Sequence, residues 1–187
     1  MFDVIFVKFL IYIFFLILIG CKLQEPTKNH GRLFLENRSN QLKIKVDNKN
    51  VSSHKQTIYE QGGTVRGLNI YIFGGALYVG GWNEPESRWN PGTWLSTNSI
   101  QSNTWHHVAL TLSGGNSVSN NAFKGYLDGI QFGSGKGSKL WHHPGDVSIG
   151  RNRDTKFHSG DFGSARYFSG LIDEVRLWNT TRTGAQI

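Results

Sequence analysis

Alternating apolar and polar residues run through most of the chain after residue 40, and this pattern predicts β-strands. In residues 41–46, Leu42, Ile44 and Val46 share one face of an extended chain. Lys43 and Lys45 then share the other face, because successive side chains of a strand point to opposite sides. The segment is therefore predicted to be a half-buried strand, with its aliphatic face in a core and its lysines toward solvent.

Residues 57–81 predict the clearest local hairpin. Gly74 and Gly75 supply the positive φ values that a two-residue hairpin turn needs, and Leu77 and Val79 belong to the returning strand. The two faces of the first strand are Leu68, Ile70 and Ile72 against Asn69 and Tyr71. This alternation is typical of the strands of a hairpin.

Two further strand segments follow in the middle of the chain. Trp105–Leu112 alternates so that three aliphatic residues point inward, namely Val108, Leu110 and Leu112. The segment 123–131 contains Asp128 followed by Gly129, a dipeptide that strongly favours a hairpin turn. A meander of antiparallel strands is therefore predicted in this half of the sequence.

Two long segments between strands are predicted to be loops. Residues 82–94 contain Pro85 and Pro91, which interrupt a strand, and this segment also carries three tryptophans. Residues 151–167 follow a short strand marked by Val147 and Ile149 and lead to the last strand of the chain.

Residues 168–178, with the sequence FSGLIDEVRLW, form the least ambiguous strand. Its faces are predicted to be Leu171, Asp173, Val175 and Leu177 against Ile172, Glu174, Arg176 and Trp178. An acid lies within each face, so Asp173 is expected to have a hydrogen-bonding or ionic partner. Strand-like runs separated by turn signals, with no helical period, predict an all-β sandwich of two sheets.

The same stretch carries a family resemblance. FSGLIDEVRLWNTTRT resembles the closing motif of laminin-G-like, concanavalin A-like jelly-roll domains of bacterial surface proteins. Three more stretches are similar to that family in order and spacing: IYEQGG with GLNIYIFGGALYVGGWN, then TWHHVALTL, then GYLDGIQFGSG leading to VSIGRNR. The resemblance covers residues 41–187 and implies an antiparallel jelly-roll sandwich that serves in binding or adhesion, in some members with a calcium ion at one rim. Relatives usually continue past the equivalent of Ile187, which leaves open whether terminal edge strands are missing.

Residues 1–20 are predicted to be a lipoprotein signal peptide. Lys8 precedes an apolar run over residues 9–19 that is short for a membrane span but suits a signal-peptide core. The sequence LIGC ending at Cys21 resembles the bacterial lipobox, which implies lipid attachment to this cysteine; an ordinary signal peptide or an uncleaved anchor is the alternative. The polar residues 21–40 are predicted to be a tether. The expected location is the bacterial cell envelope, lipid-anchored at the outer membrane or cell surface.

Composition agrees with a β protein and narrows the possible partners. The 23 glycines and 12 phenylalanines, with 18% charged residues, suit strands and tight turns. A single cysteine excludes an intrachain disulfide and a Cys-based zinc site. The formal net charge is +7, but lysine and arginine are scattered and no nucleic-acid motif is present. The charge is therefore expected to attract acidic polysaccharide rather than nucleic acid.

The positions of the carboxylates argue against catalysis. The concanavalin A-like superfamily includes glycoside hydrolases, and such enzymes need two carboxylates that flank the scissile bond. Asp173 and Glu174 are adjacent and are predicted to point to opposite faces, and Glu84 and Glu86 flank a proline in a predicted loop. A glycoside hydrolase is therefore the less favoured reading, and no enzymatic activity and no organic cofactor are predicted.

Glycan binding is the leading functional prediction. Sugars have apolar ring faces and hydroxyl edges, so lectin sites combine an aromatic platform with hydrogen-bonding side chains. The residues that fit this requirement are Trp82, Asn83, Trp89, Asn90 and Trp94 in one predicted loop, together with Trp141 and His142. The alternative is that the tryptophans fold back and cover the end of the sandwich, because large aromatic side chains are mostly buried.

Calcium binding is a second prediction. Calcium takes six to eight oxygen ligands, and Asn152, Asp154 and Asp161 in one predicted loop, with the turn residue Asp128, are the candidates. The same residue types are also ordinary turn formers. Paired histidines such as His106-His107 are predicted to point to opposite faces of a strand, so they form no chelate.

Taken together, the residues and the resemblance predict a carbohydrate-binding or adhesion module without catalytic activity. Its expected partner is a glycan or a cell-surface protein, and its lipid anchor is expected to hold it on a membrane. The alternative is a structural spacer or protein-interaction module, or a fragment of a larger adhesin. The oligomeric state is left open by the sequence.

Overall fold

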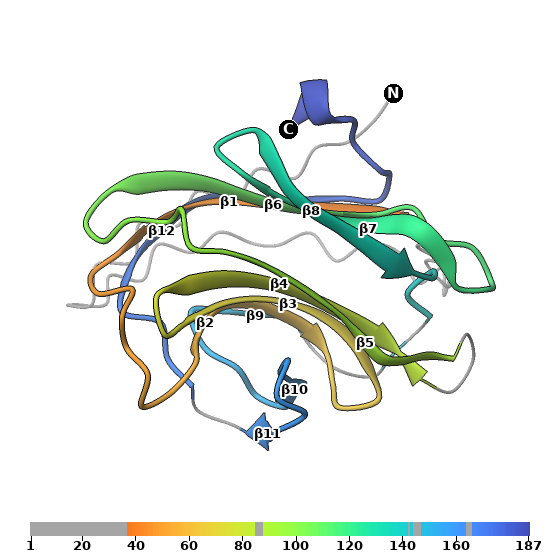
Figure 1. Cartoon of the computed structure of the whole chain (residues 1–187), viewed down its shortest axis with the longest axis horizontal. Coiled ribbons are helices and arrows are strands. Elements are labelled where there is room, and N and C mark those ends of the chain that lie inside the picture. The colour runs from red at the N-terminus through yellow and green to blue at the C-terminus, as the bar shows by residue number, and fades with distance from the viewer. Residues whose placement is uncertain (1–36, 85–87, 142, 144–146, 164–165) are drawn as a thin grey trace, which may run out of the picture.

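A computed structural model describes residues 37–84, 88–141, 143, 147–163 and 166–187 of the protein. In this part of the chain, two antiparallel sheets of five strands pack face to face, and a two-stranded ribbon lies outside them (Figure 1). The predicted all-β sandwich of two sheets is confirmed. One short 3-10 turn, η1 (Gly184–Gln186), lies near the end of the chain. None of the described helical residues forms a helix long and apolar enough to span a membrane.

Each sheet combines strands from distant parts of the chain. The β1 sheet has the order β12-β1-β6-β7-β8, and the β3 sheet has the order β5-β4-β3-β2-β9. The strands of the β1 sheet are β12 (Gly170–Trp178), β1 (Arg38–Val46), β6 (Trp105–Leu112), β7 (Ser119–Leu127) and β8 (Ile130–Gly137). The strands of the β3 sheet are β5 (Trp89–Thr97), β4 (Ala76–Asn83), β3 (Arg66–Phe73), β2 (Gln56–Gly62) and β9 (Val147–Ile149). The last strand of the chain therefore pairs beside the first.

The inner faces of the two sheets enclose one apolar core. Leu42, Ile44 and Val46 of β1 are buried, as their alternation predicts. The predicted inward residues of β6 and β3 are buried as well, and they are Val108, Leu110, Leu112, Leu68, Ile70 and Ile72. Because apolar surface removed from water contributes about 25 cal/mol per Å², this face-to-face contact is the main source of favourable free energy in the fold.

Both predicted hairpin turns have the expected backbone geometry. Gly74 and Gly75, between β3 and β4, have φ values of 57° and 89°. Asp128 and Gly129, between β7 and β8, have φ values of 52° and 77°. Positive φ at both central positions is the geometry of a type I′ turn, which matches the twist of the flanking strands. The two turns thus connect neighbouring strands of each sheet directly.

A bulge interrupts the pairing of β12 with β1. Gln41 pairs with Arg176 and Lys43 pairs with Asp173, so two residues of β12 oppose one residue of β1. At this bulge Glu174 has a φ of 48°, in the left-handed region. An extra residue in one strand changes which face the following side chains occupy.

The bulge makes the predicted faces of the last strand wrong. Ile172 and Val175 were predicted on opposite faces, but both pack against the core. Leu171, which was predicted to share a face with Val175, is 50% exposed on the outside of the sheet. Alternation alone could not show this, because it assumes a regular strand.

The prediction of a loop over residues 82–94 is wrong. β4 continues to Asn83 and β5 begins at Trp89, and these two residues are paired. Pro91 lies within β5, which is an edge strand of the β3 sheet. An edge strand tolerates proline because its outward N–H groups have no partner strand to bond.

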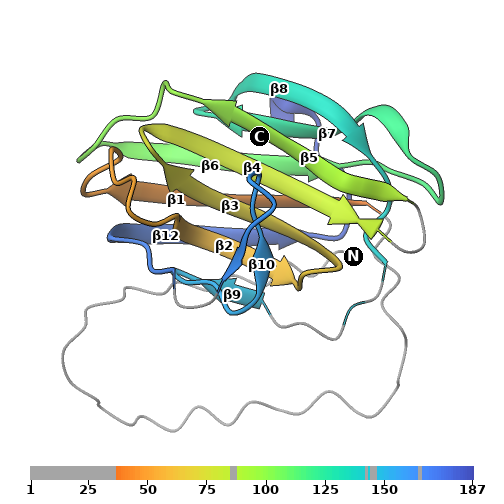
Figure 2. The same cartoon turned by 60° about the horizontal axis from the view of Figure 1, so that its bottom comes forward.

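A short ribbon covers part of the outer face of the β3 sheet. We call residues 155–163 the strap; it contains β10 (Thr155–Lys156) and β11 (Phe162–Gly163) and crosses β2 and β3 (Figure 2). Asn69 Nδ2 of β3 donates to Thr155 Oγ1 at 3.1 Å and to the Lys156 carbonyl at 2.7 Å. Asn69 and Tyr71 lie on the face opposite Leu68, Ile70 and Ile72, as their alternation predicts, and both are buried under the strap.

Aromatic contacts and an ion pair hold the strap on the sheet. The Tyr71 ring meets Phe157 edge to face, with ring centroids 4.9 Å apart. The His158 backbone N–H donates to the Tyr71 hydroxyl at 3.2 Å, and the same hydroxyl lies 2.6 Å from His158 Nδ1. Burial raises the pKa of Tyr71, so the hydroxyl keeps its proton. Lys55 Nζ lies 2.5 Å from Asp161 Oδ2 and closes the end of the strap.

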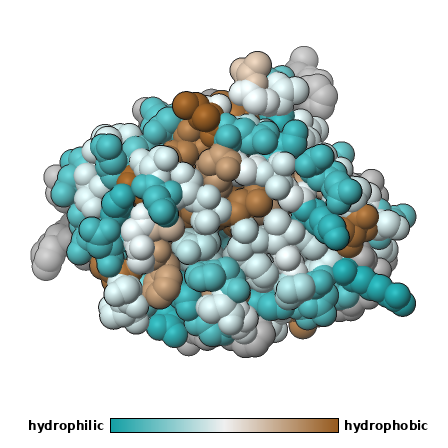
Figure 3. Space-filling model, in the orientation of Figure 1, coloured by the Kyte–Doolittle hydropathy of each residue, from teal (hydrophilic) through white to brown (hydrophobic). Residues whose placement is uncertain are grey.

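Residues 179–187 cover one end of the outer face of the β1 sheet. Ser39 Oγ donates to the Thr180 carbonyl at 3.1 Å and accepts the Arg182 backbone N–H at 2.7 Å. In Figure 1 this segment lies above the β1 sheet. On the side of the molecule seen in Figure 3, hydrophobic residues form separate patches between hydrophilic ones. Among the residues that the structure describes, none covers Trp105 at the other end of the β1 sheet, where 46% of its surface is exposed.

Asn69→Ala should destabilise the strap. The substitution removes the hydrogen-bond donor to the Lys156 carbonyl and the Thr155 hydroxyl, which are buried between the strap and the sheet. Leaving a buried acceptor without a partner lowers the free energy of unfolding by about 1–3 kcal/mol. We expect a loss of that size in urea unfolding and faster protease cleavage within residues 155–163. Asn98→Ala, at an exposed position, is the control and should change neither measurement. Unchanged stability and protection in Asn69→Ala would contradict the assignment.

Gly80→Ala should disturb the packing of β4 against its neighbours. A Cβ atom there would lie 2.3 Å from Asn69 Oδ1 and 2.4 Å from Trp94 Nε1. Overpacking of this kind costs about 1–3 kcal/mol in the free energy of unfolding. The matched control is Gly115→Ala, where no heavy atom lies within 4 Å of the added Cβ. Equal thermal stability of Gly80→Ala and Gly115→Ala would contradict the tight packing of Asn69 and Trp94 around Gly80.

Candidate functional site

The open end of the β1 sheet presents two rows of side chains across three strands. The first row is Leu171, Lys45 and Trp105, and the second row is Asp173, Lys43 and His107, from β12, β1 and β6 in that order. Residues two apart on a strand lie on the same side. Both rows therefore face outward, away from the buried residues Leu42 and Ile44.

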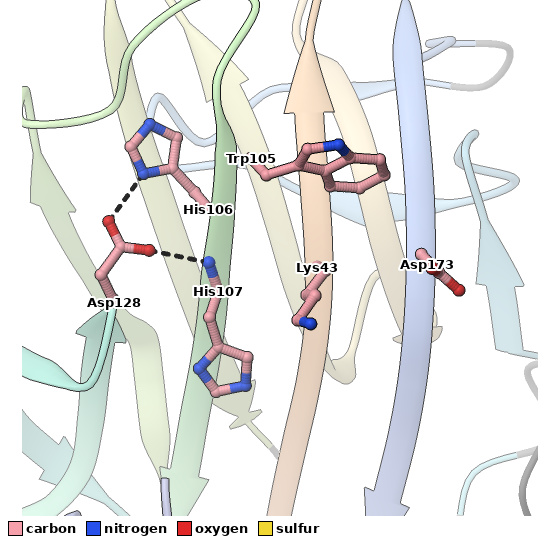
Figure 4. A pocket seen from close by; sticks show the side chains of 6 residues that line it. All are labelled: Lys43, Trp105, His106, His107, Asp128 and Asp173. Atoms are coloured by element: carbon pink, nitrogen blue, oxygen red, sulfur yellow. Dashed lines mark hydrogen bonds and ion pairs between the residues drawn. The ribbon is translucent and has the colours of Figure 1, made fainter.

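Trp105 is the most exposed of the six tryptophans, at 46% of its surface. It is the first residue of β6, and its ring extends from β6 across β1 (Figure 4). Its position follows from the alternation of β6, because Val108 points into the core and odd-numbered neighbours point outward. An exposed indole on a rigid strand offers a flat apolar surface for a ligand.

A shallow hollow of about 570 Å³ lies beside this indole. Its lining residues are Lys43, Trp105, His106, His107, Asp128 and Asp173 (Figure 4). The volume lies in the range of small-molecule sites, which are roughly 300–1,000 Å³. We call this feature the Trp105 hollow. It combines one aromatic face with both charged and neutral hydrogen-bonding groups.

A carboxylate between two cations borders the hollow. Lys43 Nζ lies 2.9 Å from Glu174 Oε1, and Arg176 Nη2 lies 2.9 Å from Glu174 Oε2. The hydrogen bond from Lys43 is the main cause that holds the pKa of Glu174 below its usual value. Glu174 therefore stays ionised at neutral pH, and it neutralises part of the positive charge of Lys43 and Arg176.

Asp128 connects the β7–β8 turn to β6. Its Oδ2 accepts from His106 Nδ1 at 2.7 Å, and its Oδ1 accepts the His107 backbone N–H at 2.8 Å. Both carboxylate oxygens are therefore engaged within the fold. This arrangement orients the turn relative to the strand that carries Trp105.

The Asp128–His106 pair resembles a catalytic dyad but lacks a free base. The Gln101 backbone N–H donates to His106 Nε2 at 3.0 Å, so Nε2 is the acceptor and Nδ1 carries the proton. In hydrolytic triads the nitrogen opposite the carboxylate must be free to take a proton from a nucleophile. Here a backbone amide occupies that nitrogen, so the pair serves structure.

His107 points out of the sheet beside Lys43, whereas His106 points inward and is buried. The prediction that these neighbours face opposite sides is confirmed. Burial, and secondly the positive charge of Arg176, lower the pKa of His107. Its imidazole is therefore neutral at physiological pH and can both donate and accept hydrogen bonds.

Two tryptophans predicted to bind a ligand lie in the interior. Trp82 is fully buried and donates its indole N–H to the Gly63 carbonyl at 3.0 Å. Trp89 is 3% exposed, packs in the core and donates to Thr93 Oγ1 at 3.0 Å. Their placement in an exposed loop was wrong, because Trp82 belongs to β4 and Trp89 to β5. The alternative, that these tryptophans cover the fold, describes them better.

The other predicted ligand residues have varied surroundings. Trp94 is half-buried and stacks on Trp82, with ring centroids 6.1 Å apart. Trp141 is half-buried beneath Lys139 Nζ, which lies 4.2 Å from its ring centroid. Asn83 is buried and donates to the Lys139 carbonyl, whereas Asn90 is exposed. His142 and Cys21 lie outside the described residues.

Three of the four predicted calcium ligands are engaged by contacts within the fold. Asp128 lies on the β1 sheet with both oxygens engaged, and Asp161 contacts Lys55 and Ser159 in the strap. Asn152 Oδ1 accepts the Arg166 backbone N–H at 2.6 Å, and the side chain of Asp154 is exposed. Within the described ranges, no three His, Cys, Asp or Glu side chains gather into a group that could hold a metal ion. These residues do not fit a shared ion, and calcium binding stays a prediction that this geometry does not support.

Trp105 was absent from the residues predicted to bind a ligand. The signal was present, because a strand that points Val108, Leu110 and Leu112 inward must point residue 105 outward. The residues predicted to bind a ligand were tryptophans in predicted loops, and Trp105 lies on a strand. The contribution of β1 and β12 to the same hollow depends on strand order, which alternation does not give.

Comparisons with known proteins agree with this architecture. The sequence model of the concanavalin A-like lectin/glucanases superfamily, of the laminin-G type, matches residues 26–187. No curated protein sequence matches the chain.

Solved structures of similar fold include binding domains from bacterial proteins. CBM40 of the Ruminococcus gnavus IT-sialidase, bound to alpha2,3-sialyllactose, is 14% identical with a TM-score of 0.56, over 82% of this chain and 81% of that one. The botulinum neurotoxin serotype D binding domain is 19% identical with a TM-score of 0.55, over 84% of this chain and 37% of that one. At such identities the likeness shows the fold alone.

The family match spans most of the chain and the observed fold is the one that the sequence resemblance implied. The chain therefore belongs to the concanavalin A-like lectin/glucanase superfamily.

Proposed function

We propose that this protein is a carbohydrate-binding module whose ligand site is the Trp105 hollow. The observation that carries the proposal is an exposed indole on a rigid strand, next to Lys43, His107 and Asp173 on the same face. Sugars bind through apolar ring faces and hydroxyl edges, and the hollow offers a partner for each. Sites on strands also hold their geometry better than sites on loops.

The structural neighbours support a binding role rather than a particular ligand. One neighbour is a CBM40 domain bound to alpha2,3-sialyllactose, and others are receptor-binding domains of botulinum neurotoxins. Sialyllactose is the ligand of that CBM40 domain, and receptor binding is the role of those toxin domains. They support the proposal because the same two-sheet scaffold carries binding surfaces in unrelated sequences.

The proposed role does not include catalysis. A glycosidase acid needs a raised pKa to carry a proton at neutral pH, but Glu174 is held ionised by Lys43 and Arg176. His106 has no free nitrogen facing a substrate. These contacts support binding without bond cleavage.

We further propose that the module is displayed on the bacterial cell envelope by a lipid on Cys21. The support is the apolar segment that precedes LIGC and the polar residues 22–37 that separate the cysteine from β1. A lipid-anchored module with a glycan site would hold the cell against a glycan-bearing surface. Adhesion is therefore the cellular role that the proposal favours.

Trp105→Ala should weaken glycan binding about tenfold or more without unfolding the protein. Removing the apolar surface that a sugar ring would bury against the indole costs about 1.5–3 kcal/mol, which is roughly a tenfold or greater loss of affinity. A glycan array probed with the wild-type protein identifies a glycan that binds. Titration of that glycan against the wild type and the variant gives the ratio of their dissociation constants. Tyr167→Ala is the matched control, since Tyr167 is an aromatic residue with 55% exposure outside the hollow.

Unchanged binding by Trp105→Ala would place the glycan site elsewhere, with Trp94 and Trp141 as the next residues to replace. A folded wild type that binds no glycan would favour the spacer or protein-interaction alternative. Circular dichroism of each variant shows whether the β fold is retained.

Cys21→Ser should remove lipid labelling. When the protein is expressed in a bacterial host fed an alkyne fatty acid, the wild type should incorporate the label and sediment with membranes. Cys21→Ser leaves no thiol in the chain, so the label should be lost. Ser52→Ala, at an exposed position, should behave as the wild type. Label retained in Cys21→Ser would contradict the lipid anchor.

A further inference from the structure

We propose that the Trp105 hollow selects a neutral, hydroxyl-rich pyranose over an acidic sugar, and that Asp173 determines this specificity. The inference rests on the proposed glycan function and adds the ligand class. It is drawn from the local charges of the hollow, and it differs from the expectation of an acidic partner that the net charge of the chain suggests.

The cations at the hollow are already partly compensated. Glu174 contacts Lys43 through one oxygen and Arg176 through the other, each at 2.9 Å. An anionic ligand that approached these cations would have to compete with a fixed carboxylate. Lys45 is a third cation on this face, and Asp128 and Asp173 are two further acids that line the hollow. Equal numbers of cations and carboxylates leave little net field to attract a carboxylate or sulfate group.

Asp173 adds a negative charge with an oxygen available to a ligand. Its Oδ1 accepts the Glu174 backbone N–H at 2.7 Å. In the part of the chain that the structure describes, no hydrogen bond to Oδ2 is present, and the side chain lines the hollow from β12 (Figure 4). An ionised carboxylate only accepts hydrogen bonds. Sugar hydroxyls satisfy it as donors, whereas the carboxylate of a uronic or sialic acid repels it.

His107 provides the complementary neutral group. It lies in the same row as Asp173, on the other side of Lys43, and strands two apart in a sheet are roughly 10 Å apart. Its lowered pKa keeps the imidazole neutral, so one ring nitrogen donates and the other accepts. A hydroxyl can use either nitrogen, and a neutral imidazole offers no charge to an anion.

Trp105 completes the arrangement from the neighbouring row. Its indole lies over β1, between the strands that carry His107 and Asp173, and Lys45 is its partner residue on β1 (Figure 4). A pyranose with its apolar face on this indole turns its hydroxyl edge toward the second row. The acceptor Asp173 and the neutral His107 then meet hydroxyls rather than ionised groups.

Matched pairs of sugars test this inference. The purified chain is titrated against polyacrylamide conjugates of galactose and galacturonic acid, of glucose and glucuronic acid, and of N-acetylneuraminic acid, at low and at high salt. We expect a neutral member to bind about tenfold or more tightly than its acid, as expected for hydrogen bonds to a charged group. Binding should change little with salt, because no net charge pairing is involved.

Asp173→Asn is the diagnostic variant, since it keeps the shape of the side chain and removes its charge. We expect this variant to bind the neutral sugar about tenfold more weakly than the wild type does. The ratio of its affinities for the neutral sugar and for the matching acid should also fall. Asp154→Asn, an exposed aspartate outside the hollow, is the matched control and should retain wild-type ratios. Should Asp173→Asn fail to fold, the wild-type ratio of each neutral sugar to its acid still decides the inference.

Tighter binding of an acidic member, falling steeply with added salt, overturns the inference but leaves the glycan function standing. If folded Asp173→Asn still prefers the neutral sugar to the acid by the wild-type ratio, Asp173 is not the cause of that preference. Binding of neither class overturns the glycan function itself, and Trp105→Ala with unchanged affinity overturns the assignment of the site.

Discussion

The alternation of side chains along β1 connects the core and the candidate site. Leu42 and Ile44 must point inward for the two sheets to pack, so Lys43 and Lys45 must point outward. The same constraint acts on β6, where an inward Val108 leaves Trp105 outside. A slip of one residue would exchange the two faces and remove the core and the site together. The free energy of sheet packing thus also fixes which residues can meet a ligand.

The bulge in β12 shapes the electrostatics of the hollow. A regular strand would place Glu174 and Asp173 on opposite faces, but the extra residue brings Glu174 outward to contact Lys43 and Arg176. Glu174 adopts a left-handed backbone conformation to do so, and such conformations persist only where surrounding contacts support them. One local irregularity thereby places a second carboxylate on the outer face, between Lys43 and Arg176. The positive charge of the whole chain is therefore a poor guide to this site.

The two outer faces of the sandwich are covered to different extents. The strap lies on the β3 sheet and buries Asn69 and Tyr71, so that surface is largely an extension of the core. Residues 179–187 cover only one end of the β1 sheet, around Ser39. Within the described part of the chain, the end of the β1 sheet that carries Trp105 remains exposed. Coverage by segments outside the two main sheets thus decides which aromatic residues are available to a ligand.

The sequence by itself determined the sandwich, its apolar faces and its tight turns, because alternation and turn dipeptides are local and act over a few residues. It placed Leu42 in the core and Gly74 in a type I′ turn correctly. Only the tertiary structure decided that Trp82 is buried, that Asn69 lies under the strap, and that Trp105 lines a hollow. Those outcomes depend on strand order, on the bulge and on segments distant in sequence, and a local pattern contains no information about contacts between distant segments.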